Sequence, residues 1–134
     1  SDAAPSRLKI AVIGCGRVGA VLAAAWHRSG HRIVAVTARS DMSRLRAEAL
    51  VPHAPIMDRR DATQDADLVL VAVPDQVLPE LVQDMVDEGS LRAGQFVVHS
   101  AGRFGLSVLE PATRVGAVPL AIAKTALPVA SKVD

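Results

Sequence analysis

The chain has 134 residues, half of them apolar, and its 15 Lys and Arg nearly balance its 14 Asp and Glu, leaving a net charge of +1. This length suffices for one domain with its own core, and the balanced charge together with few aromatic side chains argues against a nucleic-acid partner. One cysteine excludes an internal disulfide and no apolar run approaches the ~20 residues of a membrane span, so we expect a cytoplasmic protein without a membrane partner.

Strands and helices are predicted to alternate along the chain. Short apolar runs rich in β-branched residues predict strands at 8–13, 32–37, 67–73, 95–99 and 117–122, and a weaker run predicts one at 54–57. Helical spacing of apolar residues predicts helices over 17–28, 41–50, the segment between Asp75 and Gly89, and 106–115, with one or two helical turns in 61–66. Ser40 or Asp41 is expected to cap the helix over 41–50. Asp75 is expected to cap the helix that lies between Asp75 and Gly89.

This alternation predicts an α/β fold. Short connections between strands and helices favour a parallel sheet with right-handed crossovers and helices on both faces. We therefore expect a Rossmann-like, doubly wound parallel sheet of about six strands in the order 3-2-1-4-5-6.

A glycine-rich turn lies between the first predicted strand and the first predicted helix, and it comprises Gly14, Cys15, Gly16, Arg17, Val18 and Gly19. Gly14 permits the tight turn, Gly16 lets the backbone approach a pyrophosphate, and Gly19 lets the helix pack closely on the strand. The free N–H groups at the start of the helix favour an anion, and Arg17 is placed to cover it. The strand–turn–helix context predicts dinucleotide binding; the alternative is a turn that merely needs glycines.

The end of the second predicted strand indicates which dinucleotide is bound. An Asp or Glu at this point would bind the ribose of NAD, but the sequence here reads Ala38, Arg39 and Ser40. A guanidinium and a hydroxyl suit a 2′-phosphate, which favours NADP over NAD. The missing carboxylate also argues against a methyltransferase.

Two further strand ends should line the same crevice, because ligands of open α/β sheets bind beyond the carboxyl ends of the strands. Val73 and Pro74 would bring rigid apolar backbone against the nicotinamide ribose. His99 and Ser100 offer an imidazole and a hydroxyl to a substrate carbonyl or carboxylate, and they are the candidate catalytic residues; a structural role for the histidine is the alternative. No histidine has the spacing of a metal ligand, so no metal site is expected.

Three segments, 10–19, 66–75 and 97–102, resemble the N-terminal domain of a family of uncharacterised two-domain Rossmann-like oxidoreductases. That family is similar to ketopantoate reductases, pyrroline-5-carboxylate reductases and β-hydroxyacid dehydrogenases. The resemblance implies NADP binding and, in a complete member, a following helical domain that supplies the dimer interface and much of the substrate pocket. A His-Pro pair usually follows the last strand in this family, where this chain has Ala123 and Lys124.

We accordingly expect a flexible segment at 1–7, a dinucleotide-binding domain at 8–122, and a tail at 123–134 truncated before the helical domain. The predicted function is that of an NADP-dependent oxidoreductase, which passes hydride to or from a carbonyl, imine or 2-oxoacid substrate. The chain alone should lack the substrate domain, and a homodimer is one arrangement that the resemblance implies. The alternatives are a module that senses a dinucleotide without turnover, and a protein that binds CoA or an adenine nucleotide.

Overall fold

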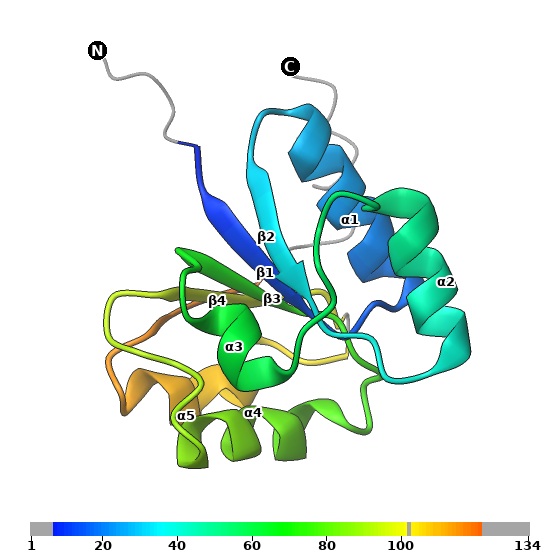
Figure 1. Ribbon diagram of the computed structural model, residues 1–134. Helices are drawn as coiled ribbons and strands as arrows, with labels where there is room; N and C mark the ends of the chain where they lie inside the picture. The colour runs from blue at the N-terminus through cyan, green and yellow to red at the C-terminus, as the bar shows by residue number, and fades with distance from the viewer. Residues whose placement is uncertain (1–6, 102, 122–134) are drawn as a thin grey trace.

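The computed structural model describes residues 7–101 and 103–121, which form one parallel sheet in the order β2-β1-β3-β4-β5 (Figure 1). The strands are β1 (Lys9–Ile13), β2 (Arg32–Val36), β3 (Leu68–Val71), β4 (Phe96–His99) and β5 (Val118–Ala121). The helices are α1 (Arg17–Arg28), α2 (Asp41–Leu50), α3 (Arg59–Thr63), α4 (Leu78–Asp87) and α5 (Glu110–Thr113), with a 3₁₀ turn, η1 (Leu106–Leu109), before α5.

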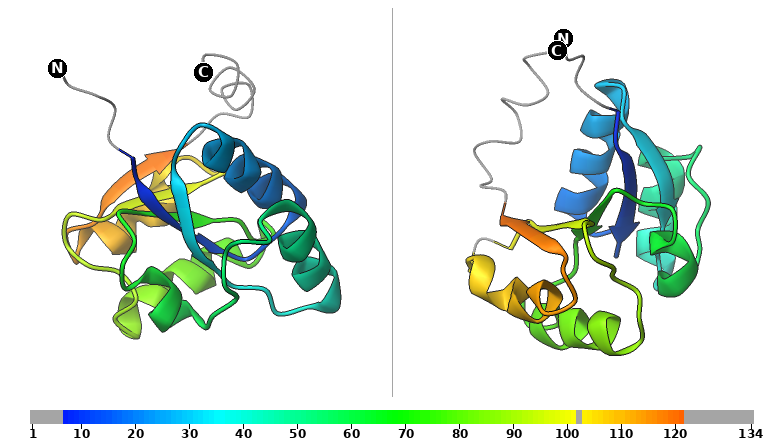
Figure 2. Two further views of the ribbon diagram at one scale, coloured as in Figure 1. Left: turned by 45° about the horizontal axis from the view of Figure 1, so that its top comes forward. Right: turned by 90° about the vertical axis from the view of Figure 1, so that its left-hand side faces the viewer.

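Helices cover both faces of the sheet. α1 packs on one face with α2 beside it, and α3, α4 and α5 lie toward the other (Figures 1 and 2). Successive side chains of a strand point to opposite faces, so Ile10 and Val12 enter the core under α1 while Ala11 and Ile13 enter the core under α4. Burial on both sides explains why the strands read as continuous apolar runs. The predicted doubly wound α/β fold is confirmed.

The sixth predicted strand, at 54–57, is reduced to a single bridge. Ile56 pairs in parallel with Val36, through bonds of 2.9 Å from the Val36 N–H to the Pro55 carbonyl and from the Met57 N–H to the Val36 carbonyl. The segment thus lies beside β2, where the order 3-2-1-4-5-6 puts a third strand. Pro55 has no N–H, and a proline interrupts a strand.

Ser40 rather than Asp41 caps α2, since its side chain accepts the Ser43 N–H. The expectation that Asp75 caps α4 is wrong. α4 begins at Leu78 with Val77 as its N-cap, and no side chain caps it. Residues 74–77 form a turn of their own, in which the Val77 N–H donates to the Pro74 carbonyl at 2.9 Å.

The predicted helix at 106–115 is a 3₁₀ turn followed by one turn of α-helix. Pro111 lies in the first turn of that α-helix, where its missing N–H costs little. Most of the predicted segment 1–7 and all of the predicted tail 123–134 lie outside the described residues.

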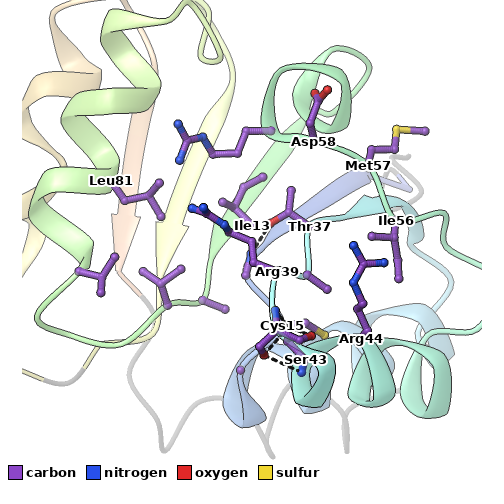
Figure 3. Close-up of a pocket in the computed structure, with 18 of the residues that line it drawn as sticks. Ile13, Cys15, Thr37, Arg39, Ser43, Arg44, Ile56, Met57, Asp58 and Leu81 are labelled. Carbon is purple, nitrogen blue, oxygen red and sulfur yellow. Dashed lines mark hydrogen bonds between the residues drawn. The ribbon is translucent and has the colours of Figure 1, made fainter.

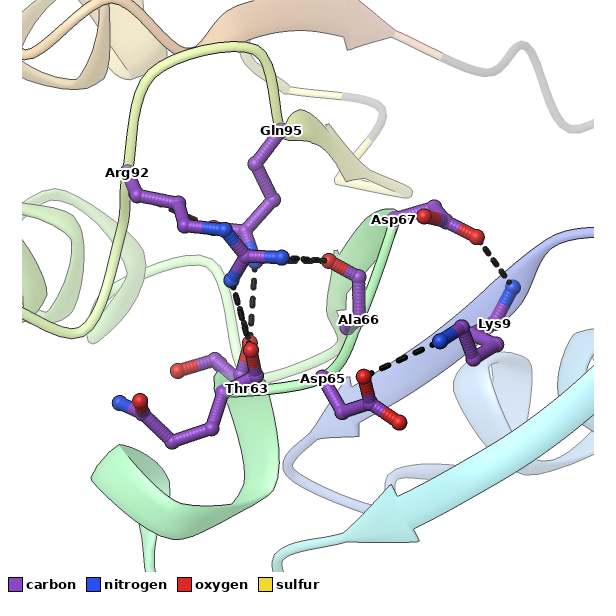
Figure 4. Close-up of polar contacts among 8 residues, drawn as sticks. Lys9, Thr63, Asp65, Ala66, Asp67, Arg92 and Gln95 are labelled. Carbon is purple, nitrogen blue, oxygen red and sulfur yellow. Dashed lines mark hydrogen bonds and ion pairs between the residues drawn. The ribbon is translucent and has the colours of Figure 1, made fainter.

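A polar network fixes the carboxyl end of α3 against the segment that leads into β4 (Figure 4). The Arg92 guanidinium donates to the carbonyls of Thr63 and Ala66 at 3.2 and 3.1 Å, and the Gln95 amide donates to the same two oxygens at 3.0 and 2.9 Å. These donors bind the carbonyl of the last residue of α3 and that of Ala66, three residues further along the chain. α3 is therefore held in place although it has only five residues.

The other end of α3 is tied to the end of α4 by a two-bond ion pair. Arg59 donates to Glu88 through Nε at 2.9 Å and Nη2 at 2.6 Å, and both side chains are more than two-thirds buried. The hydrogen bond from Arg59 lowers the pKa of Glu88, against an opposing effect of burial. Two parallel N–H···O bonds make this the strong form of an arginine–carboxylate pair.

We expect Glu88→Gln to lower the free energy of unfolding by about 1 kcal/mol at pH 7. Because the pKa of folded Glu88 lies below the value of about 4.3 in an unfolded chain, the pair stabilises the fold above that pH. This stabilisation is lost as the pH falls through the folded pKa. Urea denaturation of both proteins at pH 7 and pH 3 measures the difference, which should shrink at the lower pH.

Glu110→Gln is the matched control, because Glu110 pairs with Arg114 one helical turn away and both side chains are exposed. Its effect should be smaller than that of Glu88→Gln. An equal effect of the two variants, or a Glu88→Gln effect that grows at pH 3, would contradict the assignment.

Candidate functional site

An open cavity of about 1520 Å³ lies at the carboxyl ends of the strands (Figure 3). Its wall comes from the turn after β1, the segment from the end of β2 into α2, residues 56–61 and 64 around α3, and the segment from the end of β3 into α4. Cys15 and Ser43 lie at one end of the cavity, and Met57 and Asp58 lie at the other. The position agrees with the crevice that a doubly wound sheet offers to ligands.

The glycine-rich turn needs its glycines for space. Gly14 has φ +82°, and a Cβ there would lie 2.6 Å from Val73 Cγ1 and 2.8 Å from the Ala72 carbonyl oxygen. A Cβ on Gly19 would lie 2.2 Å from the Cβ of Ala72. The close approach predicted for Gly19 is therefore present, and its partner is the residue that follows β3.

The amino end of α1 has donors to offer. Gly16 is its N-cap and provides no side-chain hydrogen bond, and the first turn contains no acidic residue. The first helical bond runs from the Ala20 N–H to the Gly16 carbonyl at 2.9 Å, so the N–H groups of residues 17–19 have no acceptor within the helix. Gly14, Cys15 and Gly16 line the cavity, whereas the other residues of the motif are outside its lining. Those others are Arg17, Val18 and Gly19.

Two side chains that sequence reasoning missed hold this turn. The Thr37 hydroxyl accepts the Gly14 N–H at 2.7 Å, and the Arg46 guanidinium donates to the Cys15 carbonyl at 2.9 Å. Burial raises the pKa of the Cys15 thiol, and the nearby Arg46 charge opposes this only in part. The thiol is therefore protonated at neutral pH, which suits a packing residue rather than a nucleophile.

The end of β2 brings positive charge to the cavity. Ala38, Arg39 and Ser40 line the cavity, as does Arg44 from α2, and the predicted role of the first three in cofactor binding stays a prediction. Arg39 makes no hydrogen bond or ion pair with any of the residues described, and its side chain extends over the cavity toward Leu81 (Figure 3). An unpaired guanidinium at this point can bind an anion.

Other polar groups on this wall are already engaged. The Ser40 hydroxyl accepts the Ser43 N–H at 3.1 Å and donates to the Ser43 hydroxyl at 3.0 Å, as the N-cap of α2. Arg59 is paired with Glu88, and the Asp58 carboxylate caps α3 by accepting the Asp61 N–H at 2.9 Å. Arg39, Arg44 and Arg60 therefore remain as the cavity-lining cations whose side chains have no bonded partner in the described part of the chain.

The two remaining strand ends differ from each other. Val73 and Pro74 line the cavity, as predicted. His99 is buried and does not: its Nδ1 accepts the Ala101 N–H at 3.1 Å, which leaves Nε2 to donate to the Gly105 carbonyl at 2.9 Å. Ser100 is half-buried in the same loop and also lies outside the cavity lining. The imidazole thus organises its own loop, and a catalytic role for Ser100 and His99 stays a prediction.

Within residues 7–101 and 103–121, His, Cys, Asp and Glu side chains form no group of three or more that could hold a metal ion. None of the helices described there is long and apolar enough to cross a membrane.

Solved structures with the same architecture include several oxidoreductases. A proposed NADP oxidoreductase of Bacteroides fragilis is 32% identical over 78% of this chain and 40% of its own, with a TM-score of 0.66. An imine reductase variant of Myxococcus stipitatus, solved with NAD+, is 25% identical over 92% of this chain and 43% of its own, with a TM-score of 0.70. The 3-hydroxyisobutyrate dehydrogenase of Mycobacterium tuberculosis shares the fold at 21% identity over 87% of this chain, with a TM-score of 0.67.

This chain therefore spans about two-fifths of the length of these oxidoreductases. The family model of the Rossmann-like domain matches residues 1–124, nearly the whole sequence. The order of the sheet, the glycine turn after β1 and this match agree, and the chain belongs to the Rossmann-like domain family.

Proposed function

We propose that this chain is the NADP-binding domain of an oxidoreductase. The supporting observation is that one cavity joins the uncapped amino end of α1, reached through Gly14 and Gly16, to the Arg39 guanidinium, which has no bonded partner among the residues described. The amino end of α1 is suited to a diphosphate, and the Arg39 guanidinium is suited to a 2′-phosphate.

The shape of the cavity suggests how the dinucleotide lies. With its diphosphate at the amino end of α1, its adenosine extends to the end of β2, where Arg39 and Arg44 face the 2′-phosphate. The adenine ring then lies between the Arg39 side chain and the apolar side chains of Val77 and Leu81, which also line the cavity. The nicotinamide half extends the other way, past Val73 and Pro74.

The charges of this wall favour NADP over NAD. No carboxylate is present from Thr37 to Ser40, where NAD would need an acceptor for its ribose hydroxyls. Asp41, the next residue, is outside the cavity lining, and the Asp58 carboxylate is occupied at the start of α3. The similarity to a proposed NADP oxidoreductase and to an imine reductase that binds NAD+ supports a nicotinamide dinucleotide.

In the reaction that we propose, the cofactor supplies hydride chemistry and this chain binds and orients it. The substrate would be a small carbonyl, imine or 2-oxoacid compound. Because the chain spans only about two-fifths of the oxidoreductases it resembles, we place most of the substrate pocket and any dimer interface in a further domain.

Fluorescence titration of the chain with NADPH and NADH tests the proposal. NADPH should bind more tightly than NADH by at least about tenfold, because charge-assisted bonds to the 2′-phosphate are lost with NADH. Equal affinities would contradict the choice of NADP, and CoA or ATP binding more tightly than either dinucleotide would favour the alternative function. With a full-length protein, tight NADPH binding without turnover of carbonyl, imine and 2-oxoacid substrates would indicate a sensor.

A further inference from the structure

We infer that Arg46 and Thr37 are positioning residues that hold the diphosphate-binding turn in its binding conformation. They would act by keeping the Cys15 carbonyl turned toward α2, so that the turn presents N–H groups and not this oxygen to the diphosphate. The inference rests on the proposed function for its ligand, but the geometry that carries it is independent of that ligand.

The turn is held from the next strand–helix unit of the chain. The Thr37 hydroxyl accepts the Gly14 N–H at 2.7 Å, and Thr37 is itself fixed because its N–H donates to the Val12 carbonyl at 2.9 Å. Arg46 donates to the Cys15 carbonyl at 2.9 Å from the middle of α2, next to the buried Ala47. Thr37 is thus buried directly after β2, and Arg46 lies in the middle of α2.

This turn needs such restraint. Cys15 lies between Gly14 and Gly16, and glycine leaves the backbone dihedrals unusually free. The Cys15–Gly16 peptide could therefore rotate easily. The Gly16 carbonyl is fixed by the first bond of α1 and the Gly14 N–H by Thr37. The Cys15 carbonyl lies between these two points, and Arg46 is the side chain that holds it.

The orientation of this one peptide matters for an anion. In a trans peptide the C=O and the following N–H point in opposite directions, and the described chain has no cis peptide. Holding the Cys15 oxygen toward Arg46 therefore turns the Gly16 N–H the other way. Rotation of the peptide would replace a donor by a partial negative charge beside the diphosphate, while Arg46 both prevents the rotation and adds positive potential at the cavity wall.

Arg46→Met and Thr37→Val test the inference, because each removes one bond to the turn and keeps the bulk of the side chain. Both should lower the affinities for NADPH and NADH by about tenfold, which is the usual contribution of one such hydrogen bond to binding. The ratio of the two affinities should stay unchanged. Arg46→Lys should restore part of the affinity and Thr37→Ser nearly all of it. Arg44→Met is the matched control, since Arg44 lies on the same helix without bonding the turn, and it should weaken NADPH alone.

Two measurements on the ligand-free protein report on the turn itself. The carbonyl carbon resonance of Cys15 should shift in Arg46→Met, and the Gly14 amide should exchange faster with solvent in Thr37→Val, while melting temperatures change little. Unchanged affinities in both variants would overturn the inference, as would a loss confined to NADPH, which would make Arg46 a ligand of the 2′-phosphate. If the unaltered chain binds neither dinucleotide, the proposed function fails, and an unmoved Cys15 resonance with unchanged Gly14 exchange would then overturn the positioning role separately.

Discussion

Gly19→Ala is expected to destabilise the domain by about 1–3 kcal/mol, the usual cost of overpacking a core. Helix propensity alone predicts the opposite, because alanine is favoured over glycine by about 1 kcal/mol inside a helix. The added Cβ would lie 2.2 Å from the Cβ of Ala72, so α1 must move away from the end of β3. Urea denaturation at 25 °C measures the change in the free energy of unfolding.

A second substitution at Ala72 should relieve the clash that Gly19→Ala creates. Adding Ala72→Gly to Gly19→Ala removes the atom that is struck, and the double variant should recover most of the lost stability. Gly105→Ala is the control for adding a methyl group without a clash, because a Cβ at Gly105 would meet no atom of the described residues within 4 Å. A Gly19→Ala protein more stable than the original would show that α1 and the end of β3 are not in contact as described.

Local sequence patterns predicted the elements well where one pattern fixes one element. α1 runs from Arg17 to Arg28, as its apolar spacing and the glycine at position 30 predict, and Ser40 caps α2. The patterns failed where neighbours in space decide. The segment at 54–57 has the composition of a strand but makes only one bridge with β2, and the turn at 74–77 displaces the start of α4 from Asp75 to Leu78.

The site shows the same division. Gly14, Gly16 and Arg39 could be predicted because a motif and a strand end carry their meaning in the sequence itself. Thr37 and Arg46 could not, since a threonine at the end of a strand and an arginine in a helix have many other uses. Their roles arise only when β2 and α2 are packed beside the turn after β1. For the same reason, nothing near Gly19 in the sequence identifies Ala72 as its partner.

Arg39→Asp should weaken NADPH binding by about 10- to 100-fold, because it replaces the cation that we propose faces the 2′-phosphate with a group of the same charge sign as that phosphate. NADH lacks that phosphate, and an acidic residue at this strand end is what its ribose prefers, so its affinity should hold or rise. The selectivity for NADPH should therefore be lost or reversed. Titration of both dinucleotides, monitored by nucleotide fluorescence at one ionic strength, measures the ratio.

Arg32→Asp separates this local effect from the general loss of positive charge. Arg32 is exposed at the first position of β2, at the end of the same strand away from the cavity, and its replacement changes the net charge of the chain by the same amount. It should leave both affinities nearly unchanged, because an exposed charge further away than the screening length, about 10 Å at 0.1 M salt, contributes little. If Arg39→Asp weakened NADPH and NADH equally, the guanidinium would act on the shared half of the ligand and the preference for NADP would need another origin. If Arg32→Asp matched the selective loss, the preference would arise from the overall field of the domain and not from a contact at the end of β2.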